Sequence, residues 1–398
     1  MKIGVLTYWT SKDNYGQILQ CYALQHFLRK SGYDTCLIRY APVCKKKWYR
    51  KVFIIVKKVI AHGSYKGIKY FFSEERRSAK EIENKELRLT LLNDKLNKRR
   101  EFEKFRVVYI KEYPILYKSI RELQKNPPKV DALICGSDQI WHNSYADANT
   151  AGWFLHFGGK KLKRIAYAAS IGHNLSKEDL LKFKKLLEPL NSISVREDRV
   201  KQYCENVGYS KVLVVLDPTL LLESSNYEFP DVEGERINTQ KPYMFIYVLN
   251  VKVKEDIYWS SIQDYLNKEN LDVKVVVSSG YCPARDIIPE KKNILATIPE
   301  WIKLIRNSSC IITTSFHGMI FSIIMKKQFL VILLNGIYAS ANDRIVQFLE
   351  KVELKNRIYN PLYSIEAQMN ATINWSDVDF HIEQMKKESI SFLFNSLI

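Results

Sequence analysis

The repeated succession of a short apolar run, a polar loop and an amphipathic helix constrains this chain more than any other feature. Residues 2–9 (KIGVLTYW) have the pattern of a buried strand, and a polar loop that contains Asn14 follows them. Apolar residues then recur at helical spacing over residues 18–28, and residues 35–39 predict a second strand. Such a β-loop-α-β unit is typical of doubly wound α/β folds with parallel sheets.

The alternation continues over two stretches, which predicts two domains for a chain of 398 residues. Asp217-Pro218 marks the junction, because proline disfavours a helix in the residue before it. Further strands are expected at 130–135, 164–170, 192–195 and 211–216 before it, and at 243–249, 273–277, 310–313 and 329–333 after it. We expect an N-terminal Rossmann-like domain over residues 1–216, a C-terminal Rossmann-like domain over residues 217–375, and a helix over 376–398 that packs back on the first domain. Two such domains facing each other across a cleft form a GT-B-like arrangement.

The positive charge of the chain is concentrated in one segment. Residues 45–125 hold 24 Lys and Arg against 10 Asp and Glu, which supplies +14 of the net +18. We interpret this segment as a basic helical insertion in the first domain. Residues 45–60, with Trp48 and Phe53 among the lysines, could dock on a membrane surface; the alternative is a solvated helix whose apolar face packs on the domain. Nucleic acid is not expected, because the rest of the chain is nearly neutral and has no recognition motif.

The compartment follows from three sequence features. Residues 1–16 lack the apolar core of a signal peptide, and no run of about 18 apolar residues predicts a membrane span. The seven cysteines include no C-x-x-C pair, which favours reduced thiols over disulfides or zinc. We therefore expect a cytoplasmic protein, with or without contact to the inner face of the cell membrane, and no metal.

The sharpest local motif is Thr314-Ser315-Phe316-His317-Gly318, where a buried strand passes into a helix. Backbone N–H groups at a helix N-terminus favour an anion, and the Thr314 and Ser315 hydroxyls could join them. Gly318 permits close approach of the backbone, and His317 could act as a general acid. The alternative is a helix cap with a hydrogen-bonded histidine, and the spacing alone does not decide between the two.

Other polar side chains also follow predicted strands. Asp138, in the loop Gly136-Ser137-Asp138-Gln139, could accept from a sugar hydroxyl, although an Asx turn is the commoner role of such a residue. Arg196 follows the strand at 192–195, where a guanidinium suits a carboxylate or phosphate, and a surface pair with Glu197 is the alternative. Arg344 could add one more positive group to the cleft, or lie on a helix surface.

Taken together, these stretches resemble the polysaccharide pyruvyl transferase family. The resemblance runs over about residues 1–350 in family order and rests on NYGQILQCYALQHFL (14–28), DALICGSDQIWH (131–142), RIAYAASIG (164–172), SISVRE (192–197), LDPTLLL (216–222), TTSFHGMIFSIIMKKQFLVI (313–332) and NDRIVQFLE (342–350). It implies a GT-B-like fold and transfer of a pyruvyl group from phosphoenolpyruvate to a sugar, usually as a cyclic ketal on two hydroxyls.

The resemblance also implies roles for individual residues. His317 aligns with the family's catalytic histidine, a proposed general acid, and Arg196 falls where a donor-binding arginine is expected. Some members carry arginine at the position of Ser315, and this departure leaves the donor contacts open to Arg344 or a lysine.

The donor would then be held by Arg196, Arg344 and the helix N-terminus with Thr314, Ser315 and Gly318. The acceptor candidates are Asn14, Ser137, Asp138 and Gln139. Phosphoenolpyruvate is the donor substrate, no cofactor is implied, and the acceptor is a sugar of a bacterial surface polysaccharide, free or lipid-linked. The alternatives are a glycosyltransferase of the same architecture that uses a nucleotide sugar, and a non-catalytic component of a polysaccharide assembly complex.

Overall fold

The computed structural model describes residues 1–42, 95, 97–142, 145, 147–230, 241–251, 253–278 and 294–398. Within them, the first domain is a parallel sheet with the strand order β3-β2-β1-β4-β5-β6-β7. Its strands are β1 (Lys2–Leu6), β2 (Asp34–Tyr40), β3 (Glu112–Tyr117), β4 (Ala132–Cys135), β5 (Lys163–Ala169), β6 (Ser192–Val195) and β7 (Val212–Val214). Its helices are α1 (Tyr15–Lys30), α4 (Phe102–Tyr109), α5 (Ile120–Lys125), α6 (Thr150–Trp153), α7 (Lys177–Leu187) and α8 (Asp198–Asn206).

The second domain is a smaller parallel sheet with the order β11-β10-β8-β9. The short 3-10 turns η1 (Pro218–Leu221) and η2 (Ser224–Tyr227) precede it in the chain. Its strands are β8 (Tyr243–Leu249), β9 (Asp272–Ser278), β10 (Cys310–Thr313) and β11 (Gln328–Val331). Its helices are α9 (Trp259–Lys268), α10 (Ile298–Asn307), α11 (Phe316–Ile324), α12 (Asp343–Lys351) and α13 (Ile365–Asn370). The prediction of two Rossmann-like α/β domains in a GT-B-like arrangement is confirmed.

The boundaries of the predicted basic helical insertion, residues 45–125, are wrong at the C-terminal end. Residues 112–117 form β3, which pairs with β2 at the edge of the first sheet. The segment EYPILY alternates side chains between two environments, and Pro114 is tolerated because an edge strand leaves half of its N–H groups unpaired. This strand was not predicted because the lysines around it make the whole segment resemble a basic helical region. Residues 45–60, where we expect membrane contact, lie outside the described residues.

The strand orders place two ligand-binding edges in the molecule. In the first sheet the order reverses between β1 and β4, and in the second it reverses between β8 and β10. Ligands of open α/β sheets bind at such points, beyond the carboxyl ends of the strands. The loops after β4 and β10, at residues 136–142 and 314–317, are therefore the segments on which a site is expected.

The two domains share one apolar core. The Tyr15 ring of α1 stacks on Trp301 of α10 with centroids 5.1 Å apart, and its hydroxyl donates to the carbonyl of Ala296 at 2.6 Å. Ile18 and Leu19 of α1 belong to the same buried cluster as residues of α10 and α11. The N-terminal end of α1 is thereby fixed against the second domain.

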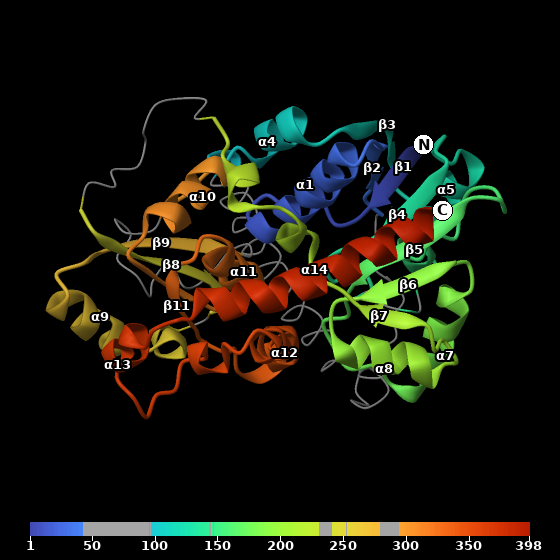
Figure 1. Cartoon of the computed structure of the whole chain (residues 1–398). Helices are drawn as coiled ribbons and strands as arrows, with labels where there is room; N and C mark the ends of the chain where they lie inside the picture. Colours follow the sequence, from blue (N-terminus) through green and yellow to red (C-terminus); the bar gives the residue numbers. More distant parts are fainter. Residues whose placement is uncertain are drawn as a thin grey trace, which may run out of the picture.

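The last helix, α14 (Trp375–Leu397), crosses from the second domain to the first (Figure 1). Its residues Phe392, Leu393 and Leu397 pack in one buried cluster with Ile3 and other core residues of the first sheet. The backbone N–H of Leu216 donates to the hydroxyl of Ser389 in this helix at 2.9 Å. The helix therefore ties the C-terminal end of the chain to the first sheet, close to strand β1.

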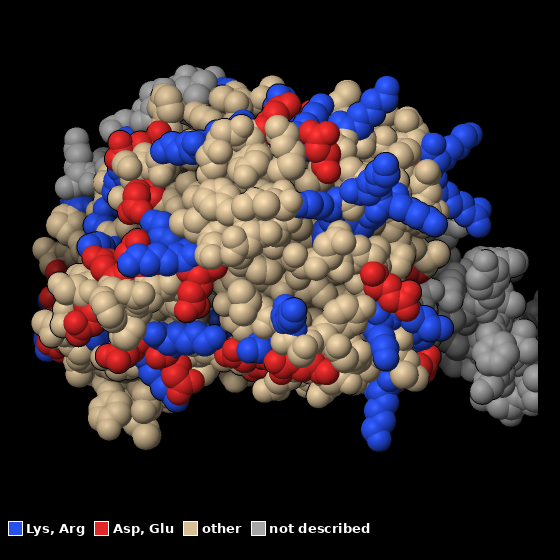
Figure 2. Space-filling view, turned by 45° about the vertical axis from the view of Figure 1, so that its right-hand side comes forward, with Lys and Arg blue, Asp and Glu red and all other residues tan. Residues whose placement is uncertain are grey.

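Charged side chains are unevenly spread on the face shown in Figure 2, where basic and acidic groups are interspersed on the left and Lys and Arg project at the right-hand edge. A search of the helices in the described ranges finds none with the length and apolar character that a bilayer crossing requires.

Candidate active site

The loop after β10 places a histidine on the first turn of α11. Ser315 caps this helix, since its hydroxyl accepts from the N–H of Gly318 at 3.2 Å. The hydroxyl of Thr314 accepts from the N–H of Leu249 at 2.9 Å and lies 3.1 Å from the Leu249 carbonyl. The hydroxyls of Thr314 and Ser315, which we predicted to bind the donor substrate, therefore also hold the loop in place.

Gly318 lets α11 approach the end of β10. A Cβ atom at this position would lie 2.2 Å from the hydroxyl oxygen of Thr313, closer than such contacts allow. This close approach positions His317 directly after the strand. The glycine thus has a packing role in the site, and its N–H donates to the Ser315 cap.

The His317 ring lies between the two domains. It is buried, and its Nε2 is 3.6 Å from Oδ2 of Asp217, the residue that follows the last strand of the first sheet. Within the described residues, Nε2 has no hydrogen-bond partner. On its other side the ring packs against the first turn of α1, where a Cβ atom on Gly16 would lie 2.1 Å from Cγ and Nδ1. The imidazole is held firmly, yet one nitrogen remains available.

The carboxylate of Asp217 accepts hydrogen bonds from several groups at the centre of the site. Its Oδ2 accepts from Nη1 of Arg196 at 2.9 Å and from the hydroxyl of Ser137 at 2.9 Å. Its Oδ1 accepts from the N–H and the hydroxyl of Thr219 at 3.0 and 2.7 Å. Burial would raise the pKa of Asp217, but His317, Arg196 and the Thr219 N–H outweigh burial and hold this pKa well below its usual range. Asp217 is a buried carboxylate anion.

Arg196 is buried with three carboxylates around its guanidinium. Besides Asp217, Asp138 lies 3.8 Å from Nη2 and Glu197 lies 3.8 Å from Nε. Burial alone would lower the pKa of Arg196, but these acids raise it, so the group is a permanent cation. Its Nε and Nη2 have no hydrogen-bond partner in the described part of the chain. These two buried donors form no hydrogen bond, although each faces a carboxylate at 3.8 Å.

A second guanidinium shares the Phe316 ring with Arg196. The Cζ atoms of Arg196 and Arg344 lie 4.7 and 5.3 Å from the ring centroid. Burial, and then the charge of Arg196, lower the pKa of Arg344 to about 10. No ion pair to Arg344 is found over the described ranges, and its buried Nε has no hydrogen-bond partner there. Arg344 remains a cation at neutral pH, and an anion in this place would offset its charge.

A cavity of about 330 Å³ opens beside these groups. It lies between the end of the first sheet and helices α12 and α14. Its lining includes Arg196, Asp217, Phe316, Arg344, Lys351 and His381. The polar side chains of both domains therefore face one enclosed space.

The candidates on the acceptor side occupy several places. Asp138 is buried and has φ of 72°, a left-handed conformation that is uncommon outside glycine, and its carboxylate faces Arg196. The Ser137 hydroxyl is turned to Asp217. Gln139 packs against Gly172, where a Cβ atom would be 2.4 Å from its Nε2. Asn14 caps α1 by accepting from the Gln17 N–H at 3.3 Å.

Three further residues belong to this site but were not predicted as site residues from the sequence. Asp217 lies in the segment LDPTLLL, which we interpreted as a domain junction and as part of the family resemblance, without a site role for Asp217. Glu197 accepts from the Ser170 hydroxyl at 2.8 Å and the Ile171 N–H at 3.1 Å. Its contact with Arg196 is buried, unlike the surface pair that was the alternative. Phe316 contacts both guanidiniums. A proline-fixed acid directly after a strand was the signal that could have found Asp217.

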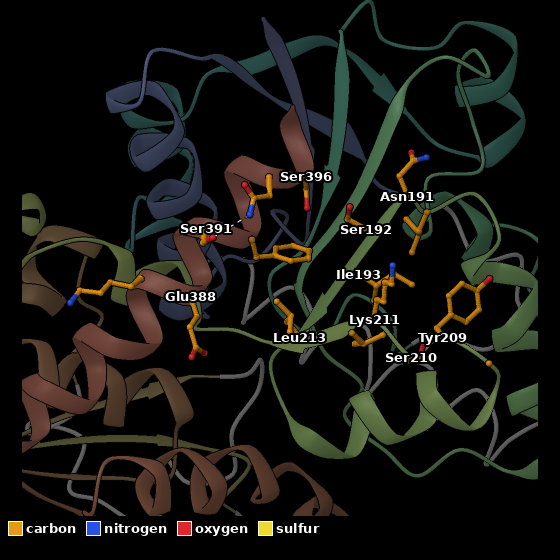
Figure 3. A pocket seen from close by; sticks show the side chains of 16 residues that line it. Asn191, Ser192, Ile193, Tyr209, Ser210, Lys211, Leu213, Glu388, Ser391 and Ser396 are labelled. Carbon is orange, nitrogen blue, oxygen red and sulfur yellow. Dashed lines mark hydrogen bonds between the residues drawn. The ribbon is translucent and has the colours of Figure 1, made fainter.

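A groove elsewhere on the first domain contains none of these residues. It measures about 1000 Å³ and lies between the start of β6, the edge strand β7 and α14 (Figure 3). Its walls carry Asn191, Tyr209, Leu213 and Ser391, among others. Because it opens at the amino ends of the strands, it is not the place where this fold binds its ligands.

Comparison with known families decides the identity of the chain. The family model described as polysaccharide pyruvyl transferase matches residues 14–335, which include His317, Asp217 and Arg196. The chain belongs to the polysaccharide pyruvyl transferase family. It is therefore a transferase of the class that acts on polysaccharides, and the resemblance in its sequence is confirmed. No curated protein matches it.

Solved structures with similar backbones include three sugar-nucleotide proteins. UDP-GlcNAc 2-epimerase from Methanocaldococcus jannaschii is 12% identical with a TM-score of 0.44, over 97% of this chain and 100% of that one. The Neisseria meningitidis UDP-GlcNAc 2-epimerase is 10% identical with a TM-score of 0.41, over 99% and 100%. Anabaena HepE, in complex with UDP and glucose, is 9% identical with a TM-score of 0.47, over 99% and 100%. The two-domain arrangement of this chain rests on its own strand orders.

Proposed function

We propose that this transferase moves the pyruvyl group of phosphoenolpyruvate to two hydroxyls of a sugar in a bacterial surface polysaccharide. One observation carries the proposal. A buried histidine, His317, stands beside the anion Asp217 and next to two guanidiniums that keep unpartnered donors. An anionic donor that must also be protonated on carbon requires this combination.

The two negative groups of the donor are opposite in charge to the two guanidiniums of the site. Phosphoenolpyruvate carries a carboxylate and a phosphate. Arg196 and Arg344 both lie against the Phe316 ring and line the cavity beside it. Guanidiniums bind both groups through parallel N–H donors. Arg344 stands in for the arginine that some relatives carry at the position of Ser315. The enclosed space keeps these charge interactions strong.

The reaction then follows in four steps. His317 gives its Nε2 proton to the methylene carbon of phosphoenolpyruvate, which becomes a methyl group, and C2 becomes electrophilic. A sugar hydroxyl attacks C2 and loses its proton. The C2–O bond to phosphate breaks, and phosphate leaves with one proton. A second hydroxyl then attacks C2, closes the ketal and loses its proton. The sugar thus loses two protons in all: one restores the proton of His317, and the other leaves on phosphate.

Asp217 has a positioning role in this scheme. It lies 3.6 Å from Nε2 of His317 and orients Arg196, whose Nη1 is 2.9 Å away. Asp138, on the opposite side of Arg196, faces the acceptor side of the cleft. No cofactor is needed, because the enol phosphate itself supplies the driving force. We also propose a cytoplasmic location, with contact to the inner leaflet through residues 45–60 when the acceptor is lipid-linked.

The test is phosphate release from phosphoenolpyruvate with a panel of synthetic and lipid-linked galactosides and mannosides. His317→Ala should abolish acceptor-dependent release, whereas His156→Ala, at a histidine bonded to the Leu186 carbonyl away from the cleft, should leave it unchanged. Calorimetric titration with phosphoenolpyruvate and with nucleotide sugars is run in parallel. If only nucleotide sugars bind, the glycosyltransferase alternative replaces the proposal; if His317→Ala retains full release, His317 is not the acid.

A further inference from the structure

Two histidines that the scheme above does not use lie in contact at the edge of the first sheet. His142 ends the loop after β4, and His173 lies in the loop after β5. Their Nδ1 atoms are 3.0 Å apart, and the rings are perpendicular with centroids 4.5 Å apart. His142 is exposed and His173 is partly buried. This is a direct hydrogen bond between two imidazoles that a solute can reach.

The pair lies on the loops after β4 and β5, beside the acceptor candidate Gln139. Gly172, next to His173, packs on Gln139, and its carbonyl accepts from the Ser340 hydroxyl of the second domain at 3.0 Å. The charges of Arg344 and Asp138 both act on His142. The two rings thus lie on the loops that carry the acceptor candidates Asp138 and Gln139, and they join the second domain through Ser340.

The hydrogen bond fixes the protons of the two rings. One Nδ1 must donate its hydrogen, and the other must accept it, so the two neutral rings are opposite tautomers. The ring that donates at Nδ1 has a bare lone pair on Nε2, and the ring that accepts carries hydrogen on Nε2. The pair therefore presents one basic nitrogen and one N–H donor. These are the two groups needed to bind an alcohol and to remove its proton.

The surrounding groups keep both rings neutral. Partial desolvation, then the charges of His173 and Arg344, lower the pKa of His142, against the opposing charge of Asp138. Partial desolvation, and the charge of Arg199, lower the pKa of His173, against the opposing charge of Asp179. At neutral pH both rings are therefore neutral, and the pair can accept a proton.

We propose that His142 and His173 together accept the proton of the attacking sugar hydroxyl. The proposal rests on the proposed function. A hydroxyl donates its hydrogen to the bare Nε2 of one ring as its oxygen bonds to C2 of the donor. The Nδ1 hydrogen of that ring passes to the other ring, whose Nε2 hydrogen then passes through solvent to His317 or to the departing phosphate. Each cycle exchanges the two tautomers, so the same pair serves the second hydroxyl of the ketal.

The experiment compares His142→Gln, His173→Gln and the double variant with His156→Gln. Transfer is measured with methyl β-galactoside and methyl β-mannoside, and phosphoenolpyruvate binding is measured by calorimetry. Because a positioned base contributes about 100-fold or more, each single variant should lose about that factor in kcat while the affinity for phosphoenolpyruvate stays within about twofold. The double variant should be no slower than the slower single variant, since the pair acts as a unit.

Two further readouts separate chemistry from structure. Imidazole added to His142→Ala should restore part of kcat, which a structural role would not allow. Nitrogen NMR of histidine-labelled enzyme should show two tautomers for this pair, with shifts on addition of an accepted sugar. If the wild type transfers pyruvyl groups and the variants keep more than about a third of kcat, the inference is wrong and the function stands. If the wild type releases no phosphate with any acceptor and binds no phosphoenolpyruvate, the function fails.

Discussion

Nε2 of His317 lies 3.6 Å from Oδ2 of Asp217, and that same oxygen also accepts from Arg196 and Ser137. The carboxylate belongs to the segment that connects the domains, whereas the histidine belongs to the second domain and the arginine to the first. One anion therefore sets the positions of the acid and of a donor-binding cation. The geometry of the site depends on the relative placement of the two domains.

Replacing Asp217 should damage stability and activity together. Asp217→Asn leaves the Arg196 guanidinium buried without its nearest charge, which costs about 3–5 kcal/mol in unfolding free energy. Transfer should fall by about 100-fold, because His317 loses the carboxylate that lies beside its Nε2 atom. Urea unfolding and phosphate release measure the two effects. Asp34→Asn removes an exposed partner of Lys111 and should cost less than about 1 kcal/mol.

The stability contributed by Asp217 should depend on acid pH. Its folded pKa lies below the unfolded value of about 3.9, so its contribution is fully present above about pH 4 and is lost as pH falls toward the folded pKa. The difference in unfolding free energy between the wild type and Asp217→Asn should be constant from pH 7 to about pH 5. It should shrink by up to about 1.4 kcal/mol per pH unit below pH 4. A constant difference down to pH 3 would contradict the assignment.

The repeated strand-loop-helix pattern was sufficient to predict the two domains, because strands buried on both faces are continuous apolar runs that stand out from polar loops. It also predicted the motif with His317 and the strand that ends at Arg196, since both side chains follow such runs directly. The strand at 112–117 was missed because edge strands bury little and take their composition from their surroundings.

The partners within the site could not be predicted in the same way. Asp217 is 100 residues from His317 in the chain, and the two come together through the packing of the domains, which includes the contact of α1 with α11. His142 and His173 belong to separate strand ends, and nothing local marks them as a pair. Contacts of this kind depend on the strand order, which a single sequence does not display.

Replacing Arg344 should separate stability from donor binding. Arg344→Met keeps an apolar contact with Phe316 and removes a cation that has no acidic partner within the described part of the chain. The variant should be as stable as the wild type or up to about 1 kcal/mol more stable. Its affinity for phosphoenolpyruvate should fall by about 10-fold or more. Thermal unfolding and calorimetry test this, and an unchanged affinity would remove Arg344 from the donor site.

The basic segment should bind anionic lipid surfaces. Replacing Lys45, Lys46, Lys47, Arg50 and Lys51 by Gln removes five charges, each worth about 1 kcal/mol near such a surface, so vesicle affinity should drop more than about 100-fold. Turnover of a soluble acceptor should be unchanged. Sedimentation with phosphatidylglycerol vesicles measures binding, and the control replaces the same number of exposed lysines, at 160, 161, 177, 184 and 185. A wild type that stays in the supernatant would show that the segment does not bind such membranes.

Gly16 should be the position where the smallest added group has the largest effect on activity. A Cβ atom there would lie 2.1 Å from two atoms of the His317 ring, and the ring is enclosed between α1, Phe316 and Asp217. Gly16→Ala must therefore displace the imidazole or the first turn of α1. The cost is about 1–3 kcal/mol in unfolding free energy, as for other overpacked cores. Transfer should fall by about 100-fold or more, because a shift of about 1 Å in a reacting group has effects of that size. Gly159→Ala is the matched control, since no atom lies within 4 Å of its added Cβ, and it should change neither quantity. If Gly16→Ala keeps wild-type kcat with its fold intact, the position of the His317 ring does not govern the reaction, and the assignment of His317 as the acid would have to be abandoned.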